Sequence, residues 1–206
     1  MVRVVKKAEE RKQEIIETAS HLFLSKGYER TTMQDVMREL NIAKGTIYHY
    51  FKSKDDLLEA VITDIAEKDQ KRMALMMEDA KGNAVDKIRL LAMSGTADNH
   101  DQQVIDDLHK INNAGMHIRL MAKLVTLQAT LYAALIQEGC EEGLFETDHP
   151  LESAEFIVSA ISFLTDYGIY PWSEEQMVRR INAFPDILEA QLKAPAGSFQ
   201  FLKELI

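Results

Sequence analysis

The sequence predicts an all-α protein with two parts, an N-terminal three-helix helix-turn-helix domain over residues 1–55 and a C-terminal helical bundle over residues 56–206. Apolar residues recur at helical spacing along almost the whole chain, no stretch alternates as a strand does, and only four prolines interrupt the pattern. Of the 206 residues, 46% are apolar and 28% charged, a balance typical of a folded protein that buries a substantial core.

The N-terminal part reads as three short helices around one small core. Residues 9–26 place apolar side chains on one helical face, and Gly27 supplies the left-handed residue that ends the helix. Thr32 with Asp35 resembles a capping box that begins a second helix, and Asn41 tolerates the left-handed conformation of a tight turn before the third. The predicted shared core is Ala19, Leu22, Phe23, Val36, Leu40, Ile47 and Phe51.

Every later segment also reads as a helix. Ser53 caps a fourth helix that runs to about Met77. Helices are then expected over residues 84–94, 101–111, 114–138, 151–168 and 174–192, with a break around residues 94–99 and a last short turn over residues 199–206. The helix over residues 114–138 is apolar nearly all round, so it should be buried on several sides. Pro185 should kink or interrupt the last long helix.

Charge is divided unevenly between the two parts. The net charge is −9, yet residues 1–55 hold eleven Lys and Arg against eight Asp and Glu, while residues 56–206 hold thirteen against twenty-five. A basic head on an acidic body is typical of a protein that touches phosphate only at its head. The single cysteine, Cys140, excludes an internal disulfide. Neither a membrane span nor a signal peptide is predicted, so a cytoplasmic location is expected.

The third helix carries polar and aromatic side chains that its short apolar stripe cannot bury. Lys44, Thr46, Tyr48 and His49 form this set, here called the reading face. A DNA major groove accepts such a helix, since lysine neutralises phosphate and threonine or histidine bonds base edges. Packing against the head is the alternative for Tyr48 and for Tyr50.

The same stretch resembles a known family. Gly27-Tyr28, Thr31-Thr32 and the run from Ala43 to Leu57 are similar to the DNA-binding head of the TetR family of bacterial repressors, over about residues 10–60. The resemblance implies a ligand-responsive transcriptional regulator of the repressing kind that binds a palindromic double-stranded DNA operator as a homodimer. A small-molecule effector in the helical body would release it. Carried over by position, the implied DNA contacts are Thr32, Lys44, Gly45, Thr46, Tyr48, His49 and Lys54.

Two positions depart from the family's commoner pattern. The turn often has glycine where Asn41 stands, and a serine or threonine where Ala43 stands. Asn41 substitutes acceptably because asparagine tolerates a positive φ. Ala43 has no hydroxyl to cap the third helix, which should cost about 1 kcal/mol of helix stability.

The body offers candidate residues for an effector pocket and for a dimer interface. Those predicted to line the pocket are His109, Met116, His117, Leu120, Met121, Leu124, Gln128, Phe163 and Tyr167. Small residues on the helix over residues 151–168 permit close helix approach, which favours a dimer seam there. The predicted seam residues are Phe156, Ser159, Ala160, Phe163, Ile181, Phe184 and Leu188.

Other constellations argue against an enzyme or a metalloprotein. His100, His109 and His117 lie near acidic residues, but the segment crosses two helix breaks and has no tight pair of histidines, so no metal site is predicted. No nucleophile elbow, phosphate-binding glycine loop or HExxH pattern occurs, so neither catalysis nor a cofactor is expected. The alternative function is a helical small-molecule sensor or carrier whose head docks on a protein partner rather than on DNA.

Overall fold

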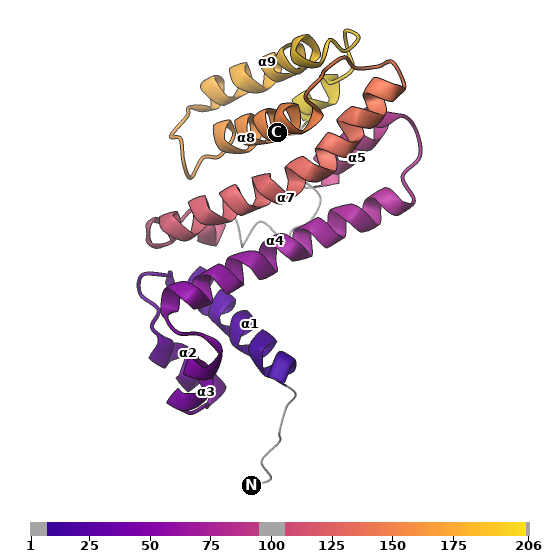
Figure 1. The fold of residues 1–206 in the computed structure, drawn as a ribbon. Helices are drawn as coiled ribbons and strands as arrows, with labels where there is room; N and C mark the ends of the chain where they lie inside the picture. Colours follow the sequence, from indigo (N-terminus) through magenta and orange to yellow (C-terminus); the bar gives the residue numbers. More distant parts are fainter. Residues whose placement is uncertain (1–7, 95–105, 205–206) are drawn as a thin grey trace. The chain divides into compact units, whose positions relative to one another are not determined.

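A computed structural model describes residues 8–94 and 106–204, and each regular element in these ranges is helical (Figure 1). The all-α prediction is thereby confirmed. The elements are α1 (Ala8–Lys26), α2 (Met33–Leu40), α3 (Lys44–Tyr50), α4 (Lys54–Glu78), α5 (Ala84–Ser94), η1 (Ile111–Asn113), α7 (Ala114–Glu141), α8 (Pro150–Leu164), α9 (Glu174–Leu192) and η2 (Gln200–Glu204). The predicted break around residues 94–99, His100 and the start of the predicted helix over residues 101–111 lie outside the described residues; residues 106–108 are helical.

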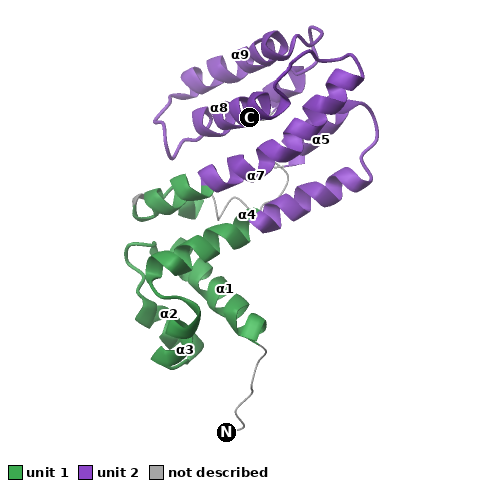
Figure 2. Ribbon diagram, in the orientation of Figure 1, with its two compact units in different colours: residues 1–66, 102–120 green, residues 67–101, 121–206 purple. Residues whose placement is uncertain are grey.

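The chain folds into two compact units, which Figure 2 colours green and purple. Unit 1 comprises residues 1–66 and 102–120, and unit 2 comprises residues 67–101 and 121–206. The boundary predicted between residues 55 and 56 is therefore displaced. The first turns of α4 belong to unit 1 because their apolar side chains, among them Leu57 and Leu58, are buried there.

The core of unit 1 is close to the one that the sequence predicts. Six of the seven predicted side chains are buried, and Leu40 is half-buried. The ring of Phe23 is fully buried and meets the ring of Tyr28 edge-on, with the centroids 5.2 Å apart. Apolar spacing and burial agree here because each short helix has a single apolar stripe to cover.

The core of unit 2 is built from the later part of α4 together with α5, α7, α8, α9 and η2. The ring of Phe145 stacks on that of Phe199 at a centroid distance of 5.8 Å. Helix α9 runs unbroken from Glu174 to Leu192, so Pro185 does not interrupt it. Pro185 is itself buried, and the buried stripe of α9 extends on both sides of it, which holds the two halves of the helix together.

Among the described residues, α7 is the one helix long and apolar enough to cross a membrane by length and composition, a test that the core helix of a soluble protein also passes. Ala129, Leu135 and Ile136 of α7 are buried in the core of unit 2. Ile118 is 52% exposed, so burial of α7 is less complete than its composition predicts.

Candidate DNA-binding face and ligand cavity

The helix-turn-helix begins with a reciprocal cap and a left-handed turn. The backbone N–H of Asp35 donates to the Thr32 hydroxyl at 3.2 Å, and the backbone N–H of Thr32 donates to the Asp35 carboxylate at 2.9 Å. The Thr32 hydroxyl also donates to the Asp35 carboxylate at 2.6 Å. This bond, and secondly the one from the Thr32 N–H, lower the pKa of Asp35 below its ordinary value. Asn41 takes φ 50°, and its N–H bonds the carbonyls that end α2. The predicted capping box and turn are thus both present, and Ala43 stands at the N-cap of α3 with no side-chain cap.

The reading face lies on the outside of unit 1. Lys44 and His49 are exposed, Tyr48 is 42% exposed, and Thr46 is half-buried. The Lys44 ammonium lies 5.6 Å from the centroid of the Tyr48 ring, within the range of a cation–π contact. Gly45 has no neighbouring atom within 4 Å of where a side chain would begin, so its position is open to solvent. This surface presents a cation, an aromatic ring and an imidazole together.

Lys54, another predicted phosphate contact, already has partners within unit 1. Its ammonium donates to the Tyr28 carbonyl at 2.9 Å and lies 4.1 Å from the centroid of the Tyr28 ring. Burial raises the pKa of the Tyr28 phenol, and the neighbouring Asp55 carboxylate raises it further. Arg119 donates to Asp55 at 2.8 Å and to Glu59 at 3.0 Å. A lysine ammonium has three donors, so Lys54 retains capacity for a phosphate.

A buried asparagine ties the segment before α7 to the loop after α1. The side-chain oxygen of Asn113 accepts from the Tyr28 N–H at 2.7 Å, and its amide donates to the carbonyls of Asp107 at 2.8 Å and Leu24 at 3.3 Å. Gly27, with φ 94°, packs so closely that an added Cβ would lie 2.7 Å from the Cβ of Asn112. These contacts explain why residues 102–120 belong to unit 1.

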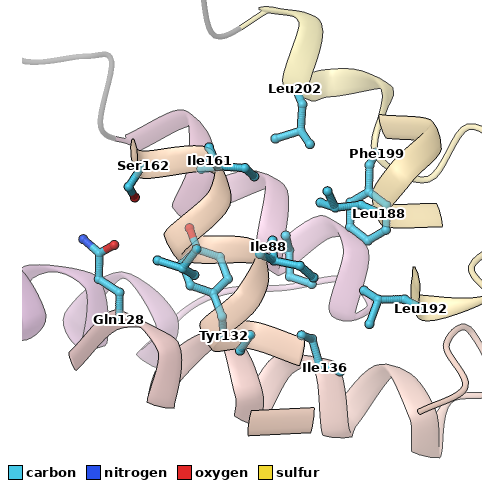
Figure 3. Close-up of a pocket in the computed structure, with 14 residues that line it drawn as sticks. Ile88, Gln128, Tyr132, Ile136, Ile161, Ser162, Leu188, Leu192, Phe199 and Leu202 are labelled. Carbon is cyan, nitrogen blue, oxygen red and sulfur yellow. The ribbon is translucent and has the colours of Figure 1, made fainter. Parts of the chain in front are cut away.

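Unit 2 contains a partly open cavity of about 170 Å³ between α5, α7, α8, α9 and η2 (Figure 3). None of the fourteen described residues that line it is charged. Eleven are apolar, and Gln128, Tyr132 and Ser162 supply the polar groups. Burial, and secondly the Asp69 carboxylate, raise the pKa of Tyr132 to about 12, so its phenol is neutral at physiological pH.

Gln128 is the one residue of the predicted effector pocket that lines this cavity. Four of the others, His109, Met116, His117 and Leu120, belong to unit 1, where the two histidine rings lie 5.0 Å apart. In unit 2, Tyr167 is 53% exposed, and Met121, Leu124 and Phe163 are not on the wall of the cavity. On α7, this cavity is therefore lined by residues nearer the C-terminal end of the helix than most of those predicted for the effector pocket. Tyr132 could have been predicted from the sequence to line the same cavity as Gln128, because it lies four residues later on the same helical face.

The predicted dimer residues divide into two groups. Phe156, Ser159, Ala160 and Phe163, here called the α8 outer face, line a hollow on the surface of unit 2, and Phe156 is 62% exposed. The prediction is wrong for the three dimer residues on α9. Ile181, Phe184 and Leu188 are buried in the core of unit 2, because the apolar stripe of α9 faces inward. The exposed large apolar side chains of α9 are Val178 and Ile187.

Two family models match this chain, one in its N-terminal part and one in its C-terminal part. The model for bacterial regulatory proteins of the tetR family matches residues 15–61, and the model for the tetracyclin repressor-like C-terminal domain matches residues 96–187. The chain belongs to the TetR family. This confirms the resemblance carried by the head, and the protein is a DNA-binding transcriptional regulator of that family.

Two relatives show how far the similarity extends. The HTH-type transcriptional repressor KstR2 of Mycolicibacterium smegmatis is 25% identical over 143 residues, which cover 67% of this chain and 69% of that protein. The HTH-type transcriptional regulator HbdR of Aromatoleum sp. is 34% identical over 73 residues, 35% of this chain and 32% of that one. Similarity to HbdR thus spans only about a third of either protein.

Solved structures extend the likeness in fold to nearly the whole chain. A TetR-family regulator from Pectobacterium atrosepticum aligns over 95% of this chain and 100% of its own, with a TM-score of 0.65 and 19% identity. A putative TetR-family regulator from Syntrophomonas wolfei aligns over 91% of this chain and 95% of its own, with a TM-score of 0.62 and 18% identity. At these identities the comparison establishes the fold alone.

Proposed function

We propose that this TetR-family regulator acts in the cytoplasm as a homodimeric repressor, binds a palindromic operator through its reading face, and is released by a small molecule in the unit 2 cavity. The observation that carries the proposal is the exposed surface of α3. Its side chains combine a phosphate-neutralising lysine with groups that bond base edges or contact a thymine methyl.

Operator binding by the reading face can be tested with a double variant. Lys44→Ala combined with Tyr48→Ala removes two exposed side chains of the reading face. We therefore expect loss of binding to the intergenic DNA upstream of the gene that encodes this protein, measured at ~150 mM salt, where phosphate contacts are partly screened. Fluorescence anisotropy of labelled DNA measures the affinity. Lys81→Ala, an exposed lysine of unit 2, is the matched control for lost positive charge. Unchanged DNA affinity of the double variant would refute the DNA role of this face.

The α8 outer face supports dimerisation. Phe156, Ser159, Ala160 and Phe163 recur at helical spacing, and the glutamates Glu152 and Glu155 border the hollow that they line. An apolar centre with a charged rim is typical of a protein–protein interface. A C2 dimer places the same patch of both subunits in contact, so a single helix face serves both partners.

A charge placed on the α8 outer face should separate the subunits. Phe156→Glu would set two carboxylates against each other across a twofold axis, so we expect a monomer in sedimentation velocity. Leu75→Glu is the control, since Leu75 is also an exposed apolar residue, at 63%, but lies on α4. A Phe156→Glu dimer as stable as the wild type would remove this face from the interface.

Release by an effector is a population shift. A ligand that prefers a body conformation in which the two heads are wrongly spaced for the operator lowers DNA affinity by its differential binding free energy, typically about 1–3 kcal/mol. A small-molecule panel titrated against the protein–operator complex tests this. If no compound that binds the cavity alters operator affinity, the release mechanism is refuted.

A further inference from the structure

The polar groups of the unit 2 cavity gather on one side. In the view of Figure 3 the side-chain oxygens of Gln128, Tyr132 and Ser162 are on the left of the cavity, while Leu188, Leu192, Phe199 and Leu202 are on the right. A ligand that fills the cavity therefore meets hydrogen-bonding groups at one end and hydrocarbon along the rest of its length.

The orientation of the Gln128 amide is fixed by an acidic neighbour. Its Nε2 donates to the Asp69 carboxylate at 2.9 Å, and an ionised carboxylate can only accept, so the nitrogen must face Asp69. The amide oxygen then faces the cavity as an acceptor, as Figure 3 shows. Asp69 is also paired with Arg72 at 2.5 Å, and neither charged residue is on the wall.

Tyr132 provides the complementary donor. Its phenol is protonated at neutral pH, as tyrosine ordinarily is, so the hydroxyl can donate to an oxygen of the ligand. A hydroxyl meets both groups with a single oxygen, because it donates to Gln128 and accepts from Tyr132. A carboxylate or phosphate has no donor for Gln128 and would be buried without a cation on the described wall, a costly arrangement.

The volume limits the size of the ligand. An apolar protein cavity of about 150 Å³ accepts benzene, so about 170 Å³ accepts one ring with a small substituent, or an aliphatic chain of similar bulk. A bulky polar extension would have to remain outside.

We propose that the effector is a neutral alcohol or phenol of about one ring, with its hydroxyl between Gln128 and Tyr132 and its hydrocarbon against α9 and η2. This assignment rests on the proposed role of the cavity as the effector site. It identifies Gln128 and Tyr132 as the residues that select a hydroxyl over an anionic group.

Three probes of similar shape test the assignment on the full-length protein by isothermal titration calorimetry. The first is 4-ethylphenol. The second is ethylbenzene, which lacks the hydroxyl, and the third is 4-methylbenzoate, which is an anion at pH 7. We expect 4-ethylphenol to bind, ethylbenzene to bind roughly thirtyfold more weakly because it lacks two neutral hydrogen bonds of about 1 kcal/mol each, and 4-methylbenzoate to show no binding.

Two variants of the cavity wall test where the hydroxyl of 4-ethylphenol binds. Tyr132→Phe and Gln128→Leu should each weaken binding of 4-ethylphenol roughly fivefold, since each removes one hydrogen bond of about 1 kcal/mol, and leave binding of ethylbenzene nearly unchanged. Tyr167→Phe is the matched control, because it removes the hydroxyl of a tyrosine that is exposed on unit 2. The comparison of probes on the unmodified protein keeps the test valid even where a variant folds poorly.

The outcomes separate the ligand class from the proposed function. Failure of 4-ethylphenol to bind, or equal binding of 4-methylbenzoate, overturns the ligand class. Binding of 4-ethylphenol that depends on Tyr132 supports the class; if it leaves operator affinity unchanged, release by this cavity fails while the ligand class stands.

Discussion

Replacing Asn113 by alanine should weaken unit 1 more than any surface change of similar size. The side chain is fully buried and makes two short hydrogen bonds, to the Tyr28 N–H at 2.7 Å and to the Asp107 carbonyl at 2.8 Å, with a longer one to Leu24. A buried polar group left without a partner costs about 1–3 kcal/mol, so the two short bonds together predict a loss of about 2–6 kcal/mol.

The measurement combines urea denaturation, followed by circular dichroism, with hydrogen exchange at the Tyr28 amide. Faster exchange at Tyr28 shows that the expected bond is the one lost. Asn112→Ala is the control, because the contact of Asn112 with Glu29 uses its backbone carbonyl, which alanine keeps. A loss below about 0.5 kcal/mol in Asn113→Ala, with unchanged exchange at Tyr28, would show that the reasoning is wrong.

Three further predictions follow from single contacts. Lys44→Ala alone should reduce the slope of log DNA affinity against log salt by about 1, and an unchanged slope means that Lys44 does not touch phosphate. Gly139→Ala should cost about 1–3 kcal/mol in urea denaturation, because the new Cβ would lie 2.2 Å from the Phe145 ring, whereas Gly115→Ala in the same helix meets no atom within 4 Å and should not destabilise. Because the pKa of Asp35 is lowered in the folded state, its contribution is present above its unfolded pKa of about 4 and is lost as pH falls through the folded pKa. The stability difference between wild type and Asp35→Asn should therefore shrink between pH 5 and pH 2 in urea titrations, and a constant difference contradicts it.

The helix-turn-helix could be read from the sequence because its signals are local. The capping box of Thr32 and Asp35 and the left-handed turn at Asn41 each depend on residues a few positions apart. The exposed side chains of α3 follow from the same local geometry, since a short helix that buries one residue, Ile47, leaves Lys44, Tyr48 and His49 exposed.

Contacts between distant segments could not be predicted from patterns in the sequence. Asn113 bonds Tyr28 across eighty-five positions, and nothing local to either residue indicates the pair. Helix α9 has an apolar stripe that suits a core or a dimer seam equally well, and only the tertiary structure assigns Ile181 and Phe184 to the core.

The sequence by itself determined the helical class, the family and the reading face, because periodicity, caps and turn chemistry act within one or two helical turns. The tertiary structure decided where unit 1 ends and which side chains enclose the cavity. A cavity exists only where several helices fail to fill the space between them, and its polar end depends on Asp69 fixing Gln128 from fifty-nine residues away. That relation belongs to the packing of the helices and has no counterpart in the spacing of residues along any one of them.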